Sequence, residues 1–233
     1  MREKREYISK LIIAFICFFE IGRFFSLIIN LIGLKVQKFN YVDIAYYDTF
    51  IELVLTIIII LLYKKCLRKD FVLFKLNKKD YINKILNYFV LFIVIKISSS
   101  LITGFLSVIL GYDLVDSENQ SAIISLTKSA PLMMLISTSI LAPIVEEGVF
   151  RLSLRKIIDN KTIFILISGL IFGLMHIFPT DLSLDFALIQ AITYVTMGFF
   201  LAYTYVETNN IWIVISIHAI NNLISMLSIL AFM

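Results

Sequence analysis

The sequence predicts an all-α, polytopic membrane protein of about seven transmembrane helices, with its N-terminus inside and its C-terminus outside. Three observations predict this class: the apolar composition, the lengths of the apolar segments and the distribution of Lys and Arg. Hydrophobic residues make up 60% of the 233 residues, whereas a soluble globular domain is about 45–50% apolar. One core of this size cannot bury that excess, so lipid must solvate much of it.

Apolar segments of membrane-spanning length recur along the whole chain. A spanning helix needs about 20 mostly apolar residues. Seven segments qualify, although the second and fifth are short and need flanking residues to span. In chain order they are Leu11–Gly33, Thr49–Tyr63, Tyr88–Gly111, Pro131–Phe150, Thr162–Phe178, Leu184–Tyr205 and Ile211–Met233.

The basic residues predict the orientation. Lys and Arg are enriched in cytoplasmic segments of membrane proteins. Sixteen of the 21 lie in the N-terminal tail and in the segments after the second and fourth helices, while three (Lys35, Lys38 and Lys128) lie on the opposite side. This distribution explains the net charge of +4 without a nucleic-acid partner.

Two polar connectors interrupt the apolar segments. The basic linker Lys64–Leu86 is predicted to form an amphipathic cytoplasmic hairpin on anionic lipid, and Tyr112–Lys128 is predicted to be a solvated outer loop. No repeat or soluble domain is visible, so we expect one membrane domain. Residues 1–128 hold the N-terminal helices and the linker, and residues 129–233 hold the C-terminal helix core.

Two adjacent carboxylates, Glu146 and Glu147, end the fourth apolar segment. An ionisable group within a membrane segment costs about 2.5–3.5 kcal/mol and usually faces the protein interior or a wet cavity. Glu147 and Arg151 are four residues apart and can pair on one helix face, while Glu146 points about 100° away. A desolvated carboxylate beside a second one suits a general base. Alternatively, the pair marks the helix end, with Arg151 reaching the interface.

Both histidines of the chain lie in apolar segments. His176 follows Phe172 by four residues, and His218 precedes Asn222 by four, so each pair shares a helix face. Ring packing can orient His176, and Asn222 can share a ligand with His218. A lone buried histidine is usually a packing residue, but finding both histidines in this setting favours a polar site within the membrane.

The motifs Glu-Glu-x-x-x-Arg, Phe-x-x-x-His and His-x-x-x-Asn lie in this order on three apolar helices. In this order they resemble the CPBP family, which comprises CAAX prenyl endopeptidases and their bacterial relatives in bacteriocin processing and self-immunity (the Abi family). The resemblance covers about residues 129–233, and the first three helices match only in being hydrophobic.

The resemblance implies a role for each motif residue. Glu146 would activate a water, assisted by His176, and His218 and Asn222 would stabilise the oxyanion of the tetrahedral intermediate. Glu147 and Arg151 would brace the site as a buried ion pair. The predicted catalytic set is Glu146, Glu147, Arg151, His176, His218 and Asn222.

No cofactor is predicted, although family members have long been labelled metalloproteases. The chain has no His-Glu-x-x-His motif, so a zinc ion would need Glu146, His176 and His218 from separate helices. Two His and one Glu are a known catalytic zinc set, which keeps zinc as the alternative. If Glu146 bound the metal, the remaining base would be Glu147, which is tied to Arg151; we therefore favour a glutamate-activated water.

The predicted helix boundaries conflict with a shared membrane depth for this site. Glu146 and His218 lie toward the cytoplasmic side of their segments, whereas His176 lies near the outer end of its own. We therefore expect either that the fourth helix continues past Arg155 or that the fifth begins deeper than its hydropathy suggests.

Four other charged residues lie in the interior of apolar segments. Glu20 and Arg23 are three residues apart and are predicted to neutralise each other. Glu52 and Lys96 either pair between the second and third helices or line a route for substrate.

The resulting prediction is a multi-pass endopeptidase of the cell membrane. Its partners would be membrane lipid and a peptide or lipid-modified protein substrate, such as a prenylated CAAX-type protein or a bacteriocin or pheromone precursor, and no nucleic acid. The alternative is a non-enzymatic bacteriocin self-immunity or accessory protein. The sequence makes no prediction of substrate identity or oligomeric state. A transporter is disfavoured because no repeat is evident and only Pro143 breaks a helix.

Overall fold

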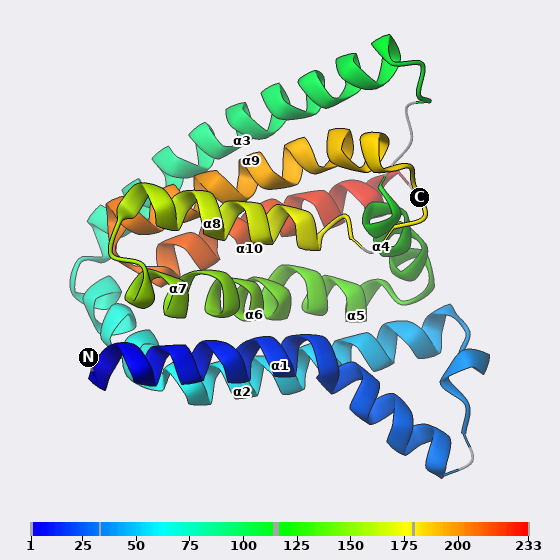
Figure 1. Cartoon of the computed structure of the whole chain (residues 1–233), viewed down its shortest axis with the longest axis horizontal. Coiled ribbons are helices and arrows are strands. Elements are labelled where there is room, and N and C mark those ends of the chain that lie inside the picture. The colour runs from blue at the N-terminus through cyan, green and yellow to red at the C-terminus, as the bar shows by residue number, and fades with distance from the viewer. Residues whose placement is uncertain (1, 33, 114–116, 179, 233) are drawn as a thin grey trace. The chain divides into compact units, whose positions relative to one another are not determined.

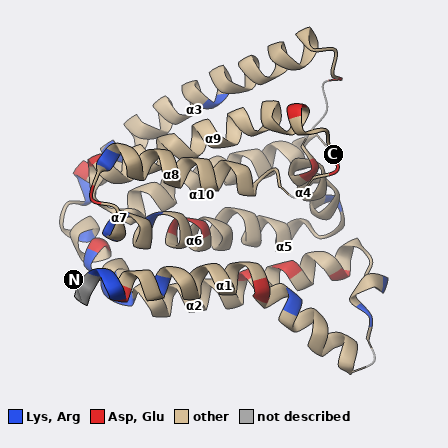
Figure 2. Cartoon of the chain, in the orientation of Figure 1, with Lys and Arg blue, Asp and Glu red and all other residues tan. Residues whose placement is uncertain are grey.

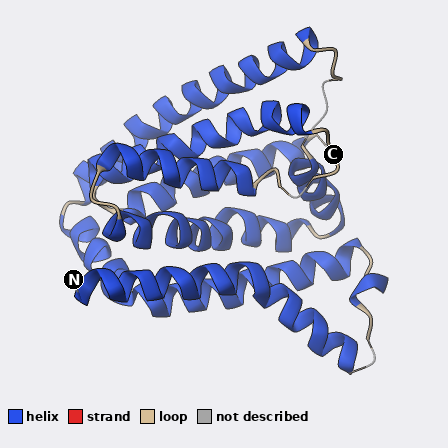
Figure 3. Ribbon diagram, in the orientation of Figure 1, coloured by secondary structure: helices blue, strands red, loops and turns tan. Residues whose placement is uncertain are grey.

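The computed structural model describes residues 2–32, 34–113, 117–178 and 180–232 and is all-α over this part of the chain. The described residues form helices joined by short connections, and none of them forms a strand (Figure 3). The helices are α1 (Arg2–Leu31), α2 (Tyr41–Leu76), α3 (Lys78–Ile109), α4 (Glu118–Ser129), α5 (Pro131–Ile136), α6 (Ala142–Glu147), α7 (Ser153–Ile157), α8 (Lys161–Met175), α9 (Leu184–Thr208) and α10 (Ile211–Ala231). A short 3-10 turn, η1 (Val36–Lys38), precedes α2.

Each of the seven predicted apolar segments is helical over most of its described length, although Ile32, residues 110–111, residues 176–178 and Phe232 lie beyond the helix ends; Gly33 and Met233 lie outside the described residues. Within the described part of the chain, five helices are long and apolar enough to cross a membrane: Lys4–Leu31, Lys78–Ile109, Pro131–Ile157, Leu184–Thr208 and Ile211–Ala231. The protein is therefore an all-α polytopic membrane protein. The count of seven spans and their orientation stay predictions.

Two connectors differ from the sequence-based expectation. The segment Tyr112–Lys128 is not simply a loop, because α4 begins at Glu118 and runs to Ser129. The linker Lys64–Leu86 is helical except at Asn77, where α2 has ended and α3 has not yet begun. Both segments are polar, and hydropathy alone does not distinguish a polar helix from a polar loop.

The chain divides into two compact units, which we describe separately. Unit 1 comprises residues 1–69, 123–157 and 218–233, and unit 2 comprises residues 70–122 and 158–217. Each unit thus combines segments far apart in the sequence. The proposed domain boundary at residue 129 stays a prediction.

In unit 1, the continuous helix Pro131–Ile157 packs beside α1 (Figure 1). Phe150 contacts the rings of Phe15 and Phe18 edge-on, at centroid distances of 6.0 and 5.7 Å. Helix α2 also lies close to the helix Pro131–Ile157, because a Cβ added at Gly148 would lie 2.3 Å from Cγ2 of Ile59. These contacts fix the helix that carries the two glutamates against α1 and α2.

Basic residues gather at one end of unit 1, where α1 begins and α7 ends (Figure 2). Lys156 of α7 lies over the Tyr7 ring of α1 at 5.8 Å, and the Tyr7 hydroxyl is 3.0 Å from Sγ of Cys66 in α2. The N-terminal tail, the end of α2 and α7, which the positive-inside rule predicted to share one side, therefore meet at one end of this unit.

In unit 2, α9 packs between α8 and α3. The contact with α8 is made backbone to backbone through glycines: a Cβ at Gly173 would lie 2.4 Å from Cα of Val195, and one at Gly198 would lie 2.7 Å from the carbonyl oxygen of Gly169. Small residues allow such close approach in membrane helices, where apolar side chains gain little by leaving lipid. The contact with α3 is polar, with Thr103 Oγ1 3.0 Å from Thr193 Oγ1.

Helix ends in unit 2 are capped by side chains. Asn160 Oδ1 accepts the Ile163 N–H at 3.0 Å and begins α8. The buried Asp70 carboxylate, which comes from the end of α2, accepts the Ile211 N–H at 3.0 Å and begins α10. The start of the helix that carries His218 is thereby fixed by a distant part of the chain.

Candidate active site

The helix that carries Glu146 and Glu147 departs from regular α geometry on both sides of them. Two π-helical segments, η2 (Ser137–Leu141) and η3 (Gly148–Leu152), flank α6. Such segments occur frequently at functional sites, because each one redirects the side chains that follow it. The helix also continues through α7 to Ile157, which confirms the first of the two alternatives for its boundary.

Glu147 is the centre of a buried polar group in unit 1. Its Oε2 lies 3.2 Å from Nε of Arg151, and both side chains are completely buried. The predicted ion pair is therefore confirmed. Its Oε1 accepts a hydrogen bond from Nδ1 of His218 at 2.9 Å. This second contact joins α6 to α10, and no spacing along the sequence could indicate it.

Glu146 lies on the other side of the same imidazole ring. Its Oε2 is 3.8 Å from Nε2 of His218, longer than a hydrogen bond. The His218 ring is thus flanked by two carboxylates, with Glu147 at Nδ1 and Glu146 near Nε2. Because the Glu147 carboxylate fixes the proton at Nδ1, a neutral ring presents a lone pair at Nε2, and only the protonated ring donates from that atom.

Asn222 lies one turn beyond His218 on α10. Its Nδ2 donates a hydrogen bond to the Thr138 carbonyl oxygen in η2 at 2.9 Å. Four helices or helical segments of unit 1 therefore position five of the six predicted residues. Of these, α6 and η3 hold Glu146, Glu147 and Arg151, α10 holds His218 and Asn222, and η2 holds the amide of Asn222.

His176 occupies the C-terminal end of α8 in unit 2. Its Nδ1 lies 2.8 Å from the Phe172 carbonyl oxygen and donates to it, while its own backbone N–H bonds to Gly173 instead. The side chain thus satisfies a carbonyl that the end of the helix would leave without a donor. In this tautomer, too, Nε2 carries a lone pair.

Two aromatic rings hold His176. The Phe172 ring lies 4.4 Å from the imidazole, which confirms the predicted packing. The Tyr194 ring of α9 stacks on it at 5.0 Å with an interplanar angle of 20°, and the Tyr194 hydroxyl bonds to Ser117 Oγ at 2.9 Å. The sequence analysis missed Tyr194, because the chain has 11 tyrosines and nothing in the sequence distinguishes this one, which lies in an apolar helix.

The two units therefore divide the predicted residues. Unit 1 brings Glu146, Glu147, Arg151 and His218 into contact, and His176 belongs to unit 2. The predicted meeting of His176 with Glu146 stays a prediction.

The donor set of unit 1 does not by itself fit a zinc ion. Glu146 and His218 supply two ligand atoms, and Glu147 accepts the hydrogen bond from the other ring nitrogen of His218, as a carboxylate behind a metal-binding histidine does. A catalytic zinc, however, takes three protein ligands. No group of three or more His, Cys, Asp or Glu side chains suited to a metal occurs among the described residues.

The remaining intramembrane charges give one confirmed pair. Nη1 of Arg23 lies 2.8 Å from Oε1 of Glu20, as predicted. Glu52 in α2 belongs to unit 1, as the predicted base Glu146 does. Its proposed pairing with Lys96 of unit 2 stays a prediction.

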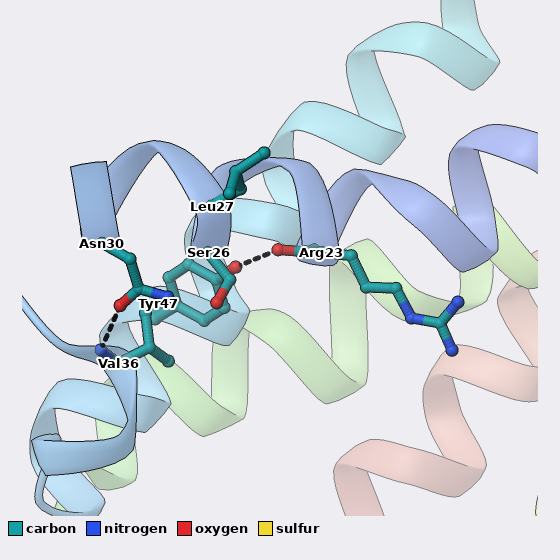
Figure 4. A pocket seen from close by; sticks show the side chains of 7 residues that line it. Arg23, Ser26, Leu27, Asn30, Val36 and Tyr47 are labelled. Carbon is teal, nitrogen blue, oxygen red and sulfur yellow. Dashed lines mark hydrogen bonds between the residues drawn. The ribbon is translucent and has the colours of Figure 1, made fainter.

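An open pocket of about 460 Å³ lies between α1 and α2 in unit 1 (Figure 4). The Tyr47 hydroxyl donates to the Gly22 carbonyl beside it, and Asn30 Oδ1 accepts the Val36 N–H at 3.3 Å. None of the predicted catalytic residues lines this pocket. It is therefore separate from the polar group around Glu147.

Comparison with known proteins agrees with the motifs. Residues 128–224 match the model of the family described as "Type II CAAX prenyl endopeptidase Rce1-like". The chain is 37% identical over 110 residues to the Bacillus subtilis protein named "Putative membrane peptidase YdiL", which covers 46% of this chain and 41% of the relative. It is 31% identical over 227 residues to an uncharacterised protein of Mycoplasma capricolum, which covers 90% of this chain and 63% of the relative.

The chain thus spans less than two thirds of the length of these curated relatives. No solved structure matches it significantly. The family match begins before α5 and ends within α10, and so includes Glu146, His176, His218 and Asn222. Over this segment, the chain is similar to the Rce1-like type II CAAX prenyl endopeptidases, in agreement with the resemblance that its three motifs indicate.

Proposed function

We propose that the protein is a membrane endopeptidase that hydrolyses a peptide bond of a membrane-associated substrate with a water activated by Glu146. The single observation that carries the proposal is the His218 ring held between Glu147 and Glu146 in the interior of unit 1. A partly buried carboxylate, an oriented imidazole and an amide donor are groups that can carry out peptide hydrolysis.

In the proposed reaction, Glu146 removes a proton from water as the oxygen attacks the scissile carbonyl carbon. The carbonyl π electrons move to oxygen, and the resulting oxyanion is stabilised by Nε2–H of His218 and by Nδ2–H of Asn222. When the C–N bond breaks, the proton held by Glu146 passes to the leaving amine. The products are a carboxylic acid and an amine, so atoms and charge balance.

The tautomer of His218 sets a condition on this mechanism. Because Glu147 accepts the Nδ1–H, Nε2 donates to the oxyanion only if the ring also carries a second proton. Two carboxylates flank the ring, with Glu147 at Nδ1 and Glu146 near Nε2. Arg151 in turn holds Glu147 in its charged form, since a buried carboxylate needs a partner.

The proposal gives His176 a different role, which is to hold the attacking water together with Glu146. Its support is the Nε2 lone pair, since Nδ1 is committed to the Phe172 carbonyl. The substrate we propose is a lipid-anchored or amphipathic peptide: a prenylated CAAX-type protein, or a bacteriocin or pheromone precursor at the cell membrane. The mechanism needs no metal.

The test is cleavage by the purified full chain in liposomes. The probes are a fluorogenic farnesylated CAAX peptide, the same peptide without the lipid, and a fluorogenic amphipathic peptide precursor. Glu146→Gln should lower kcat by about 10³-fold, because it removes the general base, and should leave membrane insertion intact. The exposed Glu207→Gln of α9 is the matched control.

Normal turnover by Glu146→Gln would refute the assignment of the base. If the wild-type chain binds these peptides without cleaving them, and Glu146→Gln binds them equally well, a non-enzymatic immunity or accessory role replaces the proposal.

A further inference from the structure

The Thr138 carbonyl lacks the backbone donors that helix geometry normally supplies. In an α-helix it would accept the N–H of Ala142, but in η2 that N–H bonds to Ser137 instead. In the π register the donor would be residue 143, which is proline and has no N–H. The π segment and Pro143 together leave the Thr138 carbonyl to the side chain of Asn222, whose Nδ2 donates to it at 2.9 Å.

A second contact holds the other end of the same amide. Asn221 Nδ2 donates to Oδ1 of Asn222 at 3.0 Å, and Asn221 is 6% exposed. Adjacent residues on a helix do not face each other, so the two side chains must bend toward one side to make this contact. Such an arrangement is more specific than ordinary packing of α10 requires.

The two contacts together determine the orientation of the Asn222 amide. Rotating it by 180° would place its oxygen against the Thr138 carbonyl and its NH₂ against that of Asn221, losing both hydrogen bonds. With one Nδ2 hydrogen donated to Thr138, the second hydrogen of the same group has a fixed direction.

We propose that Asn221 is a positioning residue, which, with the Thr138 carbonyl made available by η2 and Pro143, holds Asn222 so that its second Nδ2–H meets the oxyanion. This inference rests on the proposed function, which assigns Asn222 to the oxyanion. Asn221 does not touch the substrate; it acts through Asn222.

A kinetic double-mutant cycle on the full chain in liposomes tests the coupling, with the fluorogenic peptide that the wild type cleaves fastest. Asn222→Ala should lower kcat by about 100-fold, the effect of removing one oxyanion donor. Asn221→Ala should lower kcat by about tenfold with KM within twofold, because misorientation weakens transition-state stabilisation alone. The double variant should be no slower than Asn222→Ala, and the exposed Ser228→Ala of α10 is the control.

The outcomes separate the inference from the proposed function. If Asn222→Ala leaves kcat unchanged, the oxyanion role of Asn222 fails. If Asn222→Ala is slow but Asn221→Ala turns over like the wild type, or the two losses multiply in the double variant, the positioning role fails.

Two further variants test the orientation of the Asn222 amide. Asn221→Asp keeps the size of the side chain but turns the donor into an acceptor, so it should be at least as slow as Asn221→Ala. Pro143→Ala restores a backbone N–H that can compete for the Thr138 carbonyl and should lower kcat less, by about threefold. Wild-type rates in both variants would contradict the proposal.

Side-chain amide NMR provides a readout that does not depend on turnover. In protein labelled with ¹⁵N-Asn in micelles, the Asn222 NH₂ pair is identified by its loss in Asn222→Ala. Asn221→Ala should bring its two proton shifts together and speed their exchange with water by about tenfold, as the amide begins to rotate. An Asn222 pair unchanged in Asn221→Ala would overturn the inference.

Discussion

The two histidines of the protein are held in different ways in the two units. In unit 1, His218 donates Nδ1–H to a buried carboxylate, Glu147, which is itself paired with Arg151. In unit 2, His176 donates Nδ1–H to the backbone carbonyl of Phe172 and stacks on Tyr194. The tautomer is the same in both, but the charge of the acceptor differs.

This difference teaches how one residue type can serve two chemical roles. A carboxylate stabilises an imidazole that carries both protons, which then donates from Nε2. A carbonyl and an aromatic ring orient a neutral imidazole, which accepts at Nε2. The function proposed above assigns His218 to the oxyanion and His176 to the water, and each experiment below acts on one side of this comparison.

The largest effect is expected from breaking the charged support of His218. Arg151→Ala leaves Glu147 buried without its cation, at a cost of about 3–5 kcal/mol. We expect a low folded yield and loss of cleavage, measured by size-exclusion chromatography and thermal unfolding in detergent. Arg155→Ala, near the end of the same helix, is the control. A stable and fully active Arg151→Ala protein would show that the buried pair is dispensable.

Removing each histidine should separate the two supports. His218→Ala removes a hydrogen bond to a charged group and should cost about 1.5–3 kcal/mol of unfolding free energy. His176→Ala removes a hydrogen bond to a neutral carbonyl and should cost about 0.5–1.5 kcal/mol. Both variants should lose cleavage. Equal destabilisation in chemical unfolding would contradict the contrast between the two acceptors.

Tyr194 allows the neutral support to be weakened alone. Tyr194→Leu removes a ring contact worth about 0.5–1.5 kcal/mol, whereas Tyr194→Phe keeps the ring and loses only the bond to Ser117. Because the chain has two histidines, ¹⁵N-His NMR resolves each ring. We expect Tyr194→Leu to shift the His176 signals strongly, Tyr194→Phe to shift them weakly, and neither to move His218; a shift of His218 alone would be the contrary result.

The smallest expected effect is that of a chelator. If His218 supplies protons and His176 a lone pair, cleavage needs no metal, and prolonged dialysis against a strong chelator should leave the rate unchanged. Glu207→Gln protein, treated in parallel, controls for dialysis losses. Inactivation by the chelator that zinc reverses would assign Glu146 and both histidines to a metal instead.

Much of the fold was predictable because apolar length is a direct physical requirement of the bilayer. Each of the seven apolar segments is helical over most of its described length. Contacts within one helix were also predictable: the pairs Glu147–Arg151 and Glu20–Arg23 follow from spacings of four and three residues.

Contacts between helices were not predictable in the same way. The Glu147–His218 bond and the stacking of Tyr194 on His176 depend on how each helix is rotated about its axis, which sequence spacing does not specify. The π segments add to the difficulty, because each changes the rotation of everything after it. Pro143 signalled a break, but not that the break would offer the Thr138 carbonyl to Asn222.

The glycine contacts of α8 and α9 have a mechanical consequence. With Gly169 and Gly173 lying directly on the backbone of α9, α8 cannot slip lengthwise, because a shift of one turn, about 5.4 Å, would drive larger side chains into space that admits only hydrogen. The position of the His176 ring along the α8 axis, beside Tyr194, is therefore fixed by Gly169 and Gly173, which lie one to two turns earlier in the same helix. Any motion of α8 within unit 2 must therefore carry α9 with it, so the two helices move as a pair.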